Sequence, residues 1–217
     1  MPPTCCDADY DAMFDARTAR RQLTAYRRSG PIGSTRRLIE AIEAEGVDGA
    51  TVLDVGGGVG IIGFELLAAG AARLTGIDAA RAYVAVARRE AARRGLDERA
   101  TYRHGDFVAL ADEVDAADIV TLDRVICCYG DWPALVDRSA ARARRLYGLV
   151  YPTDRWWTRT AIAIGNLTMS LSRRSFRGYV HPERAVDARI RAAGFERRAH
   201  HRGWLWQTVV YERIEMS

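Results

Sequence analysis

The nine residues VLDVGGGVG, positions 52 to 60, decide how this chain folds. An apolar run that ends in three consecutive glycines predicts a strand followed by a tight turn, because glycine adopts positive φ angles and lets other groups approach the backbone closely. The next segment, GIIGFELLAAG (60–70), predicts a helix that ends at Gly70. A glycine turn between a strand and a helix N-terminus favours binding of a phosphate or of another nucleoside-bearing ligand.

The same alternation continues along the chain. Further strands are predicted at 72–78, 100–106, 117–123 and 144–151, with a helical segment before each of them. A helix is predicted at 181–194, and two closing strands at 195–200 and 204–213. Strands separated by helices indicate βαβ units and a parallel sheet that is covered on both faces. We therefore expect a Rossmann-like, doubly wound, seven-stranded and mostly parallel sheet of the α/β class.

The expected organisation is a single domain over residues 1–217. It consists of a helical N-terminal cover (1–49), a ligand-binding core (50–151), a helical lid between the fifth and sixth strands (152–180), and a terminal helix with two strands (181–217). In the cover, the apolar spacing predicts one helix from Tyr10 to Arg28. Ser34 is expected to cap a second helix that runs to about Glu45.

The composition is that of an ordinary globular protein, with 48% hydrophobic and 28% charged residues in 217. No apolar run approaches the roughly 18 residues that would span a bilayer. The first twenty residues carry acidic side chains where a signal peptide would have a basic and then an apolar stretch. A cytoplasmic location is expected on these grounds.

The basic residues do not form a dense stripe. All 32 of them are arginines, the net charge is +4, and the charges are scattered as singles and short doublets. This pattern indicates a solvated surface and argues against a nucleic-acid partner. The four cysteines form two adjacent pairs, Cys5-Cys6 and Cys127-Cys128, without the spacing of a zinc site, so no metal is expected. Reduced thiols are the simple interpretation; capture of a soft metalloid is the alternative.

Two other interpretations of the glycine turn can be tested by pattern. A P-loop requires a lysine, and the chain has none. A dinucleotide G-x-G-x-x-G is present as Gly58, Gly60 and Gly63. That match begins beyond Gly56, the glycine that ends the strand, and it leaves Asp54 without a role.

Residues 53–60 read hydrophobic-Asp-hydrophobic-Gly-x-Gly-x-Gly, which resembles the first motif of class I S-adenosylmethionine (SAM)-dependent methyltransferases. Further matching residues follow in family order: Asp78 at the end of TGID, then HGDF (104–107) and DIVTLDRV (118–125). The resemblance implies SAM as cofactor, with Asp78 at the ribose hydroxyls, Asp106 at the adenine amino group and Phe107 at the adenine face. The full set of cofactor residues that it implies is Asp54, Gly56, Gly57, Gly58, Gly60, Asp78, Ala79, Asp106, Phe107, Leu122 and Asp123.

Each of these residues also has a purely structural interpretation. Asp54 could orient the glycine turn, and Asp78 and Asp106 could cap the helices that follow them. Phe107 could be a core residue. Their occurrence together, at consecutive strand ends and in family order, favours cofactor binding.

A finer likeness points to the magnesium-protoporphyrin O-methyltransferase branch. It rests on YRRSG, LDVGGGVG, LDRVICCY and YVHPERAVDARIRAAGF. The chain departs from that branch at Cys127-Cys128-Tyr129, where a His-Tyr-Pro-like ending is expected. A porphyrin is accordingly one acceptor among several.

Methyl transfer from a sulfonium is an in-line displacement, so positioning in a dry pocket supplies much of the catalysis. Tyr129 and His181 are the candidate catalytic residues, and Asp123 could serve as a base for an amine acceptor. The acceptor is expected to be a small organic molecule, methylated at oxygen or nitrogen. Asp123 is followed by Arg-Val-Ile and not by the Pro-Pro-aromatic sequence of nucleic-acid amino methyltransferases. The competing functions are a nicotinamide-dependent reductase and a non-catalytic SAM-fold binding protein.

The segment between the fifth and sixth strands carries a helical stripe of Trp157, Ala161, Ile164, Thr168 and Leu171. Three interpretations stay open. The stripe could form a lid over a flat or apolar acceptor, it could pack onto the sheet, or it could make peripheral contact with membrane lipid.

Overall fold

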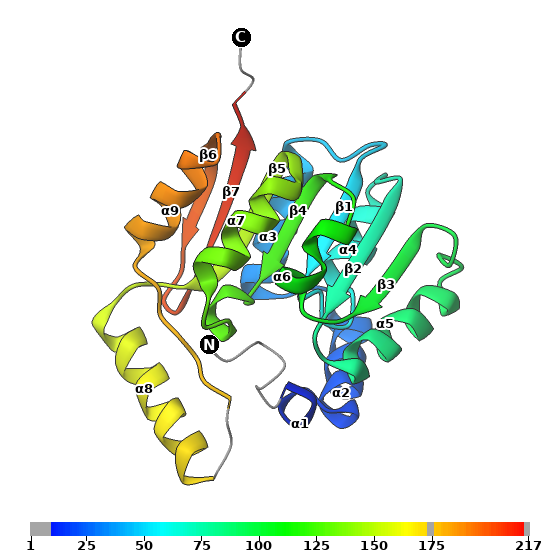
Figure 1. Cartoon of the computed structure of the whole chain (residues 1–217). Helices are drawn as coiled ribbons and strands as arrows, with labels where there is room; N and C mark the ends of the chain where they lie inside the picture. Colours follow the sequence, from blue (N-terminus) through cyan, green and yellow to red (C-terminus); the bar gives the residue numbers. More distant parts are fainter. Residues whose placement is uncertain (1–9, 173–175, 215–217) are drawn as a thin grey trace.

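The computed structural model describes residues 10–172 and 176–214, which form a seven-stranded sheet flanked by helices (Figure 1). The strand order is β3-β2-β1-β4-β5-β7-β6. Strands β1 to β5 run parallel, and β7 runs antiparallel to both of its neighbours. The predicted fold class is confirmed. The strands are β1 Thr51–Val55, β2 Arg73–Asp78, β3 Ala100–His104, β4 Ala117–Asp123, β5 Ala143–Pro152, β6 Phe195–Arg202 and β7 Trp206–Arg213.

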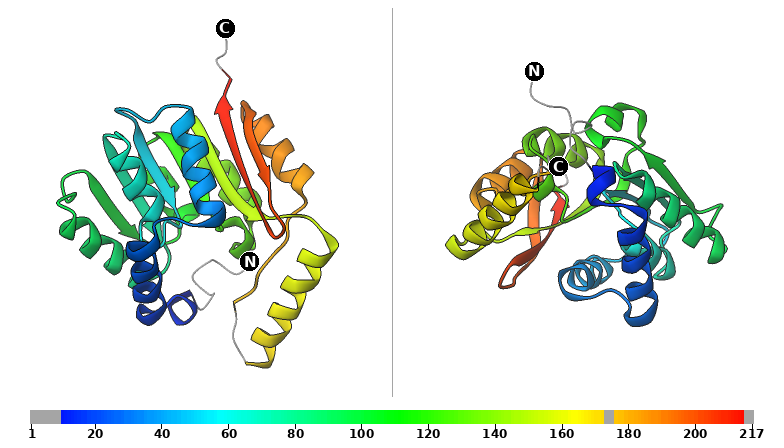
Figure 2. Two further views of the ribbon diagram at one scale, coloured as in Figure 1. Left: turned by 180° about the vertical axis from the view of Figure 1, so that it is seen from behind. Right: turned by 90° about the horizontal axis from the view of Figure 1, so that it is seen from below.

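Helices cover both faces of the sheet (Figure 2). One face packs against α3, α4 and α5, with α2 on α5, and the other packs against α6, α7 and α9. The helices are α1 Tyr10–Met13, α2 Ala16–Ser29, α3 Gly33–Ala44, α4 Ile61–Ala68, α5 Arg81–Arg93, α6 Phe107–Leu110, α7 Trp132–Arg142, α8 Trp156–Leu171 and α9 Glu183–Ala192. Short 3₁₀ turns lie at η2 Ala111–Glu113 and η3 Ile126–Cys128.

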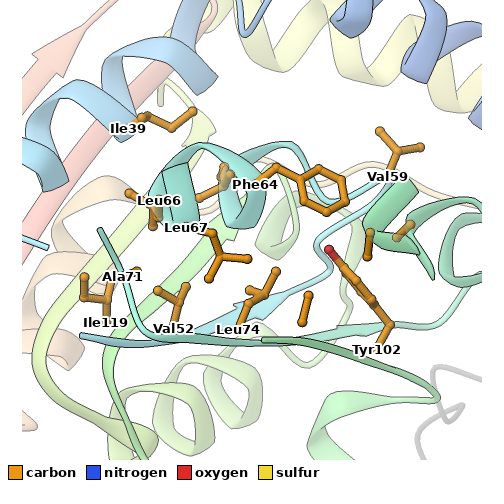
Figure 3. Packing of buried hydrophobic residues seen from close by; sticks show 14 of the residues in the cluster. Ile39, Val52, Val59, Phe64, Leu66, Leu67, Ala71, Leu74, Tyr102 and Ile119 are labelled. Carbon is orange, nitrogen blue, oxygen red and sulfur yellow. The ribbon is translucent and has the colours of Figure 1, made fainter. Parts of the chain in front are cut away.

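Close packing of α4 onto the sheet holds the turn that follows β1. Phe64 and Leu66 of α4 lie in one buried cluster with Val52 of β1 and Leu74 of β2 (Figure 3). A Cβ atom on Gly63 would lie 2.2 Å from Leu74 Cδ2, so only glycine permits this approach of helix to strand. The glycine turn is thus anchored on its helical side.

Two predictions about the N-terminal helices are wrong in detail. The single helix expected from Tyr10 to Arg28 is two helices, because the Asp15 carboxylate accepts the backbone N–H of Thr18 at 2.7 Å and caps a new start. Ser34 does not cap the next helix. It lies inside α3, which begins at Gly33 in a positive-φ conformation and has no side-chain cap.

The segment between β5 and β6 contains the expected helix, α8, which extends beyond the edge of the sheet (Figures 1 and 2). The predicted stripe does not pack onto the sheet, since Ala161, Ile164, Thr168 and Leu171 are all exposed. Asn166 instead binds the returning chain, exchanging two 2.8 Å hydrogen bonds with the backbone of Gly178. Within the described parts of the chain, no helix has the length and apolar character needed to cross a membrane.

Candidate functional site

A cavity of about 780 Å³ lies at the carboxyl ends of the parallel strands. The strand order reverses there, since β1 has β2 on one side and β4 on the other, and this is where doubly wound sheets bind ligands. Its floor is built from the ends of β1 to β4, and its opposite wall from α1, α2 and the start of α3. The expected helical cover over the strand ends is therefore present.

The glycine turn forms part of the cavity floor through Gly56 and Gly58. Gly56, Gly58 and Gly60 have φ angles of 65°, 57° and 88°, in the left-handed region that favours glycine. A Cβ atom on Gly56 would also lie 2.5 Å from Val125 Cγ2. Gly57 and Gly60 belong to the same turn but do not line the cavity.

Asp54 lies behind the turn and not on the cavity wall. Its carboxyl group accepts the Thr121 hydroxyl at 2.7 Å and lies so close to Gly57 that a Cβ atom there would be 2.6 Å from Oδ2. Burial raises the pKa of Asp54 to about 7, against the effect of the Thr121 hydrogen bond. This geometry matches the structural interpretation of Asp54, which is to orient the turn.

Asp78 connects the turn to the end of β2. Its carboxylate accepts the backbone N–H of Gly58 at 2.9 Å and that of Ala80 at 2.7 Å. Burial raises the pKa of this carboxyl group, and the two amide donors oppose that change. Asp78 and Ala79 both line the cavity.

Asp106 and Phe107 follow β3 and also line the cavity. The Asp106 carboxylate caps α6 through the Val108 amide at 3.0 Å, as the structural interpretation expected. It also accepts the Tyr129 hydroxyl, with distances of 3.1 and 3.0 Å to its two oxygens. The buried Phe107 ring is part of the core, and its edge reaches the cavity.

Asp123 ends β4 on the cavity wall. One of its oxygens accepts the Thr35 hydroxyl from α3 at 2.6 Å, and both pair with the guanidinium of Arg124. Arg124 has a φ of 61°, and among the described residues no other non-glycine residue has a positive φ. Such a conformation costs on the order of 1–3 kcal/mol and concentrates at functional sites. The neighbouring Leu122 is buried in the core and does not reach the cavity.

Comparison with known proteins agrees with this arrangement. Residues 52–146, from β1 into β5, match the family model of a methyltransferase domain. This part of the chain is therefore similar to a methyltransferase domain. No match is found among curated proteins.

Solved structures share the fold of this chain at low sequence identity. Magnesium protoporphyrin IX methyltransferase (ChlM) from Synechocystis PCC 6803, with bound SAH, is 20% identical, with a TM-score of 0.67 over 94% of this chain and 87% of that one. An O-methyltransferase family protein from Burkholderia thailandensis is 17% identical, with a TM-score of 0.71 over 94% of this chain and 62% of that one. The [4+2]-cyclase SpnF is 15% identical, with a TM-score of 0.62 over 82% of this chain and 81% of that one.

The two candidate catalytic residues lie in different places. Tyr129 lines the cavity, with its hydroxyl on Asp106. His181 is buried outside the cavity lining, where Nε2 lies 2.7 Å from the Ile126 carbonyl oxygen and the ring packs between Trp132 and Tyr179. Burial lowers the pKa of His181. In this structure the enclosed imidazole packs against η3 and does not line the cavity, so the catalytic role of His181 stays a prediction that the geometry does not support.

Cys127 and Cys128 both line the cavity, with their sulfur atoms 3.7 Å apart. Both thiols are directed at the carbonyl oxygen of Arg124, and the Tyr10 hydroxyl donates to the carbonyl oxygen of Cys128 at 2.7 Å. Cys5 and Cys6 lie outside the described residues. Within the described ranges, no group of three or more His, Cys, Asp or Glu side chains could hold a metal ion.

Sequence reasoning missed part of the aromatic wall of the cavity. Phe14 packs edge-on against Tyr83 and Phe176 with ring centroids 5.7 Å apart in each pair, and Trp206 lines the far side. Helical spacing marked Phe14 as apolar, but only the tertiary fold brings it over the strand ends. No residue of α8 lines the cavity, so this helix does not act as its lid in the described arrangement.

Proposed function

We propose that this chain is a SAM-dependent methyltransferase, which transfers the methyl group of SAM to an oxygen or nitrogen atom of a small, flat organic molecule with an apolar body. One observation supports this proposal above the others. A single cavity joins acid-bearing strand ends on one side to aromatic side chains on the other. The acids suit the polar and cationic groups of SAM, and the aromatic wall suits an apolar acceptor.

The polar groups on the cavity floor fit SAM. The open backbone of Gly56 and Gly58 allows close approach, and Asp78 has lone pairs left for ribose hydroxyls after accepting two amides. Asp106 and Phe107 would face the adenine, and Asp123 the methionine ammonium group. Four residues do not line the cavity and would support the site indirectly, by shaping the glycine turn and the end of β4: Asp54, Gly57, Gly60 and Leu122. SAM supplies an electrophilic methyl group on a sulfonium.

The acceptor half is the part of the cavity under α1 and α2. A flat molecule would be held there by Tyr10, Phe14 and Trp206. The fold would raise the rate by aligning the acceptor atom with the methyl group of SAM and by excluding water from the cavity. A carboxylate acceptor needs no base, whereas a phenol or amine would transfer its proton. Asp123, which lines the cavity, would accept the proton of an amine. A porphyrin is one candidate, because ChlM is named as a magnesium protoporphyrin IX methyltransferase.

We assign Tyr129 to the part of the cavity at the strand ends, where SAM is proposed to bind. Its hydroxyl is committed to Asp106, so it holds that carboxylate in place and is not free to take a proton from an acceptor. The role we propose for Tyr129 is therefore positioning, in place of the catalytic role predicted from the sequence.

The test begins with calorimetric titration of SAM and of NADH into the same preparation. The proposal predicts saturable SAM binding and none for NADH. Methyl-labelled SAM is then incubated with matched aromatic carboxylates, phenols and amines, and label is counted in the organic extract. Tight SAM binding without transfer to any compound would favour a non-catalytic SAM-fold protein, and NADH binding alone would favour a reductase.

A further inference from the structure

The face of α8 that points away from the protein is apolar. Its inner side packs against other segments of the same chain through Thr158, Ile162 and Asn166. On a helical projection, the apolar residues of the opposite side fall within roughly a 100° arc. We call them the outer stripe: Trp156, Ala163, Ile164, Leu167 and Leu171. Four of the five expose more than half of their surface, from 58% for Ile164 to 77% for Leu171.

This arrangement is the reverse of an ordinary surface helix, whose apolar face turns inward. A contiguous exposed apolar patch marks an interaction surface. A second set of exposed apolar atoms lies at the base of α8. Trp204, in the β6–β7 hairpin, is 72% exposed, and its carbonyl oxygen accepts the Trp157 indole N–H at 3.2 Å. Trp156 packs edge-on against Trp157. Three tryptophans therefore gather at one end of the outer stripe.

The charge of the same segment indicates what covers the stripe. Residues 155–182 contain five arginines and no acidic side chain. Arg155 and Arg159 stand at the tryptophan end, where Arg155 lies over the Trp157 ring and Arg159 pairs with Asp154, the residue just before this segment. An apolar helix face with arginine on its flanks and tryptophan at its end is the pattern of a helix that lies in the headgroup region of an anionic membrane. If a second copy of this chain covered the stripe through the same segment, the arginines of the two copies would face one another and repel.

We propose that α8, through its outer stripe and together with Trp204, docks onto the surface of a membrane that contains anionic phospholipid. Figure 1 places α8 at the same end of the molecule as α2, several of whose residues line the cavity. The proposal is independent of the proposed function, because it concerns residues outside the cavity and its test uses neither SAM nor an acceptor.

The test is sedimentation of the full chain with vesicles of phosphatidylcholine, with and without phosphatidylglycerol. The protein is expected to pellet with the mixed vesicles, and less so as salt rises, because salt screens the arginines. Leu167→Glu on the outer stripe should lower the partition coefficient by about 10-fold or more. Ala161→Glu, on the flank of the same helix, is the matched control, since it adds the same charge, and it should change binding far less.

Three results would overturn the proposal. The wild-type chain could stay in solution with both kinds of vesicle. The two glutamate variants could lose binding equally, which would show that charge alone is sensed. Analytical ultracentrifugation without lipid could give a dimer that Leu167→Glu converts to a monomer, in which case the outer stripe is covered by a second copy. Circular dichroism of both variants checks that α8 is retained.

Discussion

The carboxylate of Asp78 accepts the backbone amide of Gly58 at 2.9 Å, and this bond ties the end of β2 to the glycine turn that follows β1. The two residues are twenty positions apart in the chain and both line the cavity. Asp78 thus shapes the turn from within, and in the proposed function it also presents lone pairs to the cofactor. Its substitution tests the cofactor half most directly.

We expect Asp78→Ala to weaken SAM binding by roughly 10- to 100-fold, because a charge-assisted hydrogen bond contributes about 1.5–3 kcal/mol. Isothermal calorimetry measures the change. Asp78→Asn keeps the shape and separates the loss of charge from a collapsed turn. Asp97→Ala, an exposed acid after α5, serves as the control. Unchanged affinity in a folded Asp78→Ala protein would remove this residue from the cofactor site.

Tyr129→Phe tests whether Tyr129 positions Asp106 or acts on the acceptor. Loss of the two contacts to the carboxylate should lower SAM affinity by roughly 5- to 10-fold, as expected for one hydrogen bond to a charged group. The measurement is again calorimetric and needs no acceptor. If the affinity for SAM is unchanged while methyl transfer is lost, the original interpretation of Tyr129 as a catalytic residue stands.

Sequence reasoning succeeded where local pattern and fold rules coincide. The alternation of strands and helices predicted the sheet, and parallel strands bring their ends to one edge, which is why Asp78 and Asp106 share a cavity although 28 positions separate them. The same logic could not separate a wall residue from one just behind it. Asp54 and Asp78 end neighbouring strands, yet one faces the core and the other the cavity.

Other features depend on tertiary contacts that leave no periodic signal. The left-handed conformation of Arg124 and the pairing of Thr35 with Asp123 join β4 to α3, 88 positions apart. His181 stood next to the expected lid in sequence, but its ring lies beneath η3. The stripe on α8 has helical spacing, and nothing in that spacing shows whether the stripe faces the protein or solvent.

Packing between α4 and β2 provides a test of stability with an internal control. Gly63→Ala would drive a methyl group into Leu74, so the free energy of unfolding should fall by about 1–3 kcal/mol. Gly165→Ala, also inside a helix, has no atom within 4 Å of its added Cβ and should gain roughly 0.5–1 kcal/mol. Urea denaturation of both variants gives the comparison. Equal effects of the two substitutions would contradict the close contact at Gly63.

The buried carboxyl group of Asp54 should make the stability of the protein depend on pH. Its pKa is raised to about 7 by burial, from an ordinary value of 3.8, so the folded chain retains a proton that the unfolded chain releases. The contribution of Asp54 to the free energy of unfolding should therefore fall as pH rises from about 4 to about 7, by up to about 4 kcal/mol in total, and stay level above that. Asp54→Asn cannot ionise, so this part of the pH dependence should disappear.

The measurement for Asp54 is urea unfolding of both proteins across that pH range, and the quantity that matters is the difference between them. Other titrating groups, including Asp78, are present in both proteins and largely cancel in the difference. The wild type should lose stability relative to Asp54→Asn as the pH increases towards 7. A constant difference would mean that Asp54 is ionised in the folded chain throughout, with the glycine turn supplying the donors that its buried carboxylate then requires.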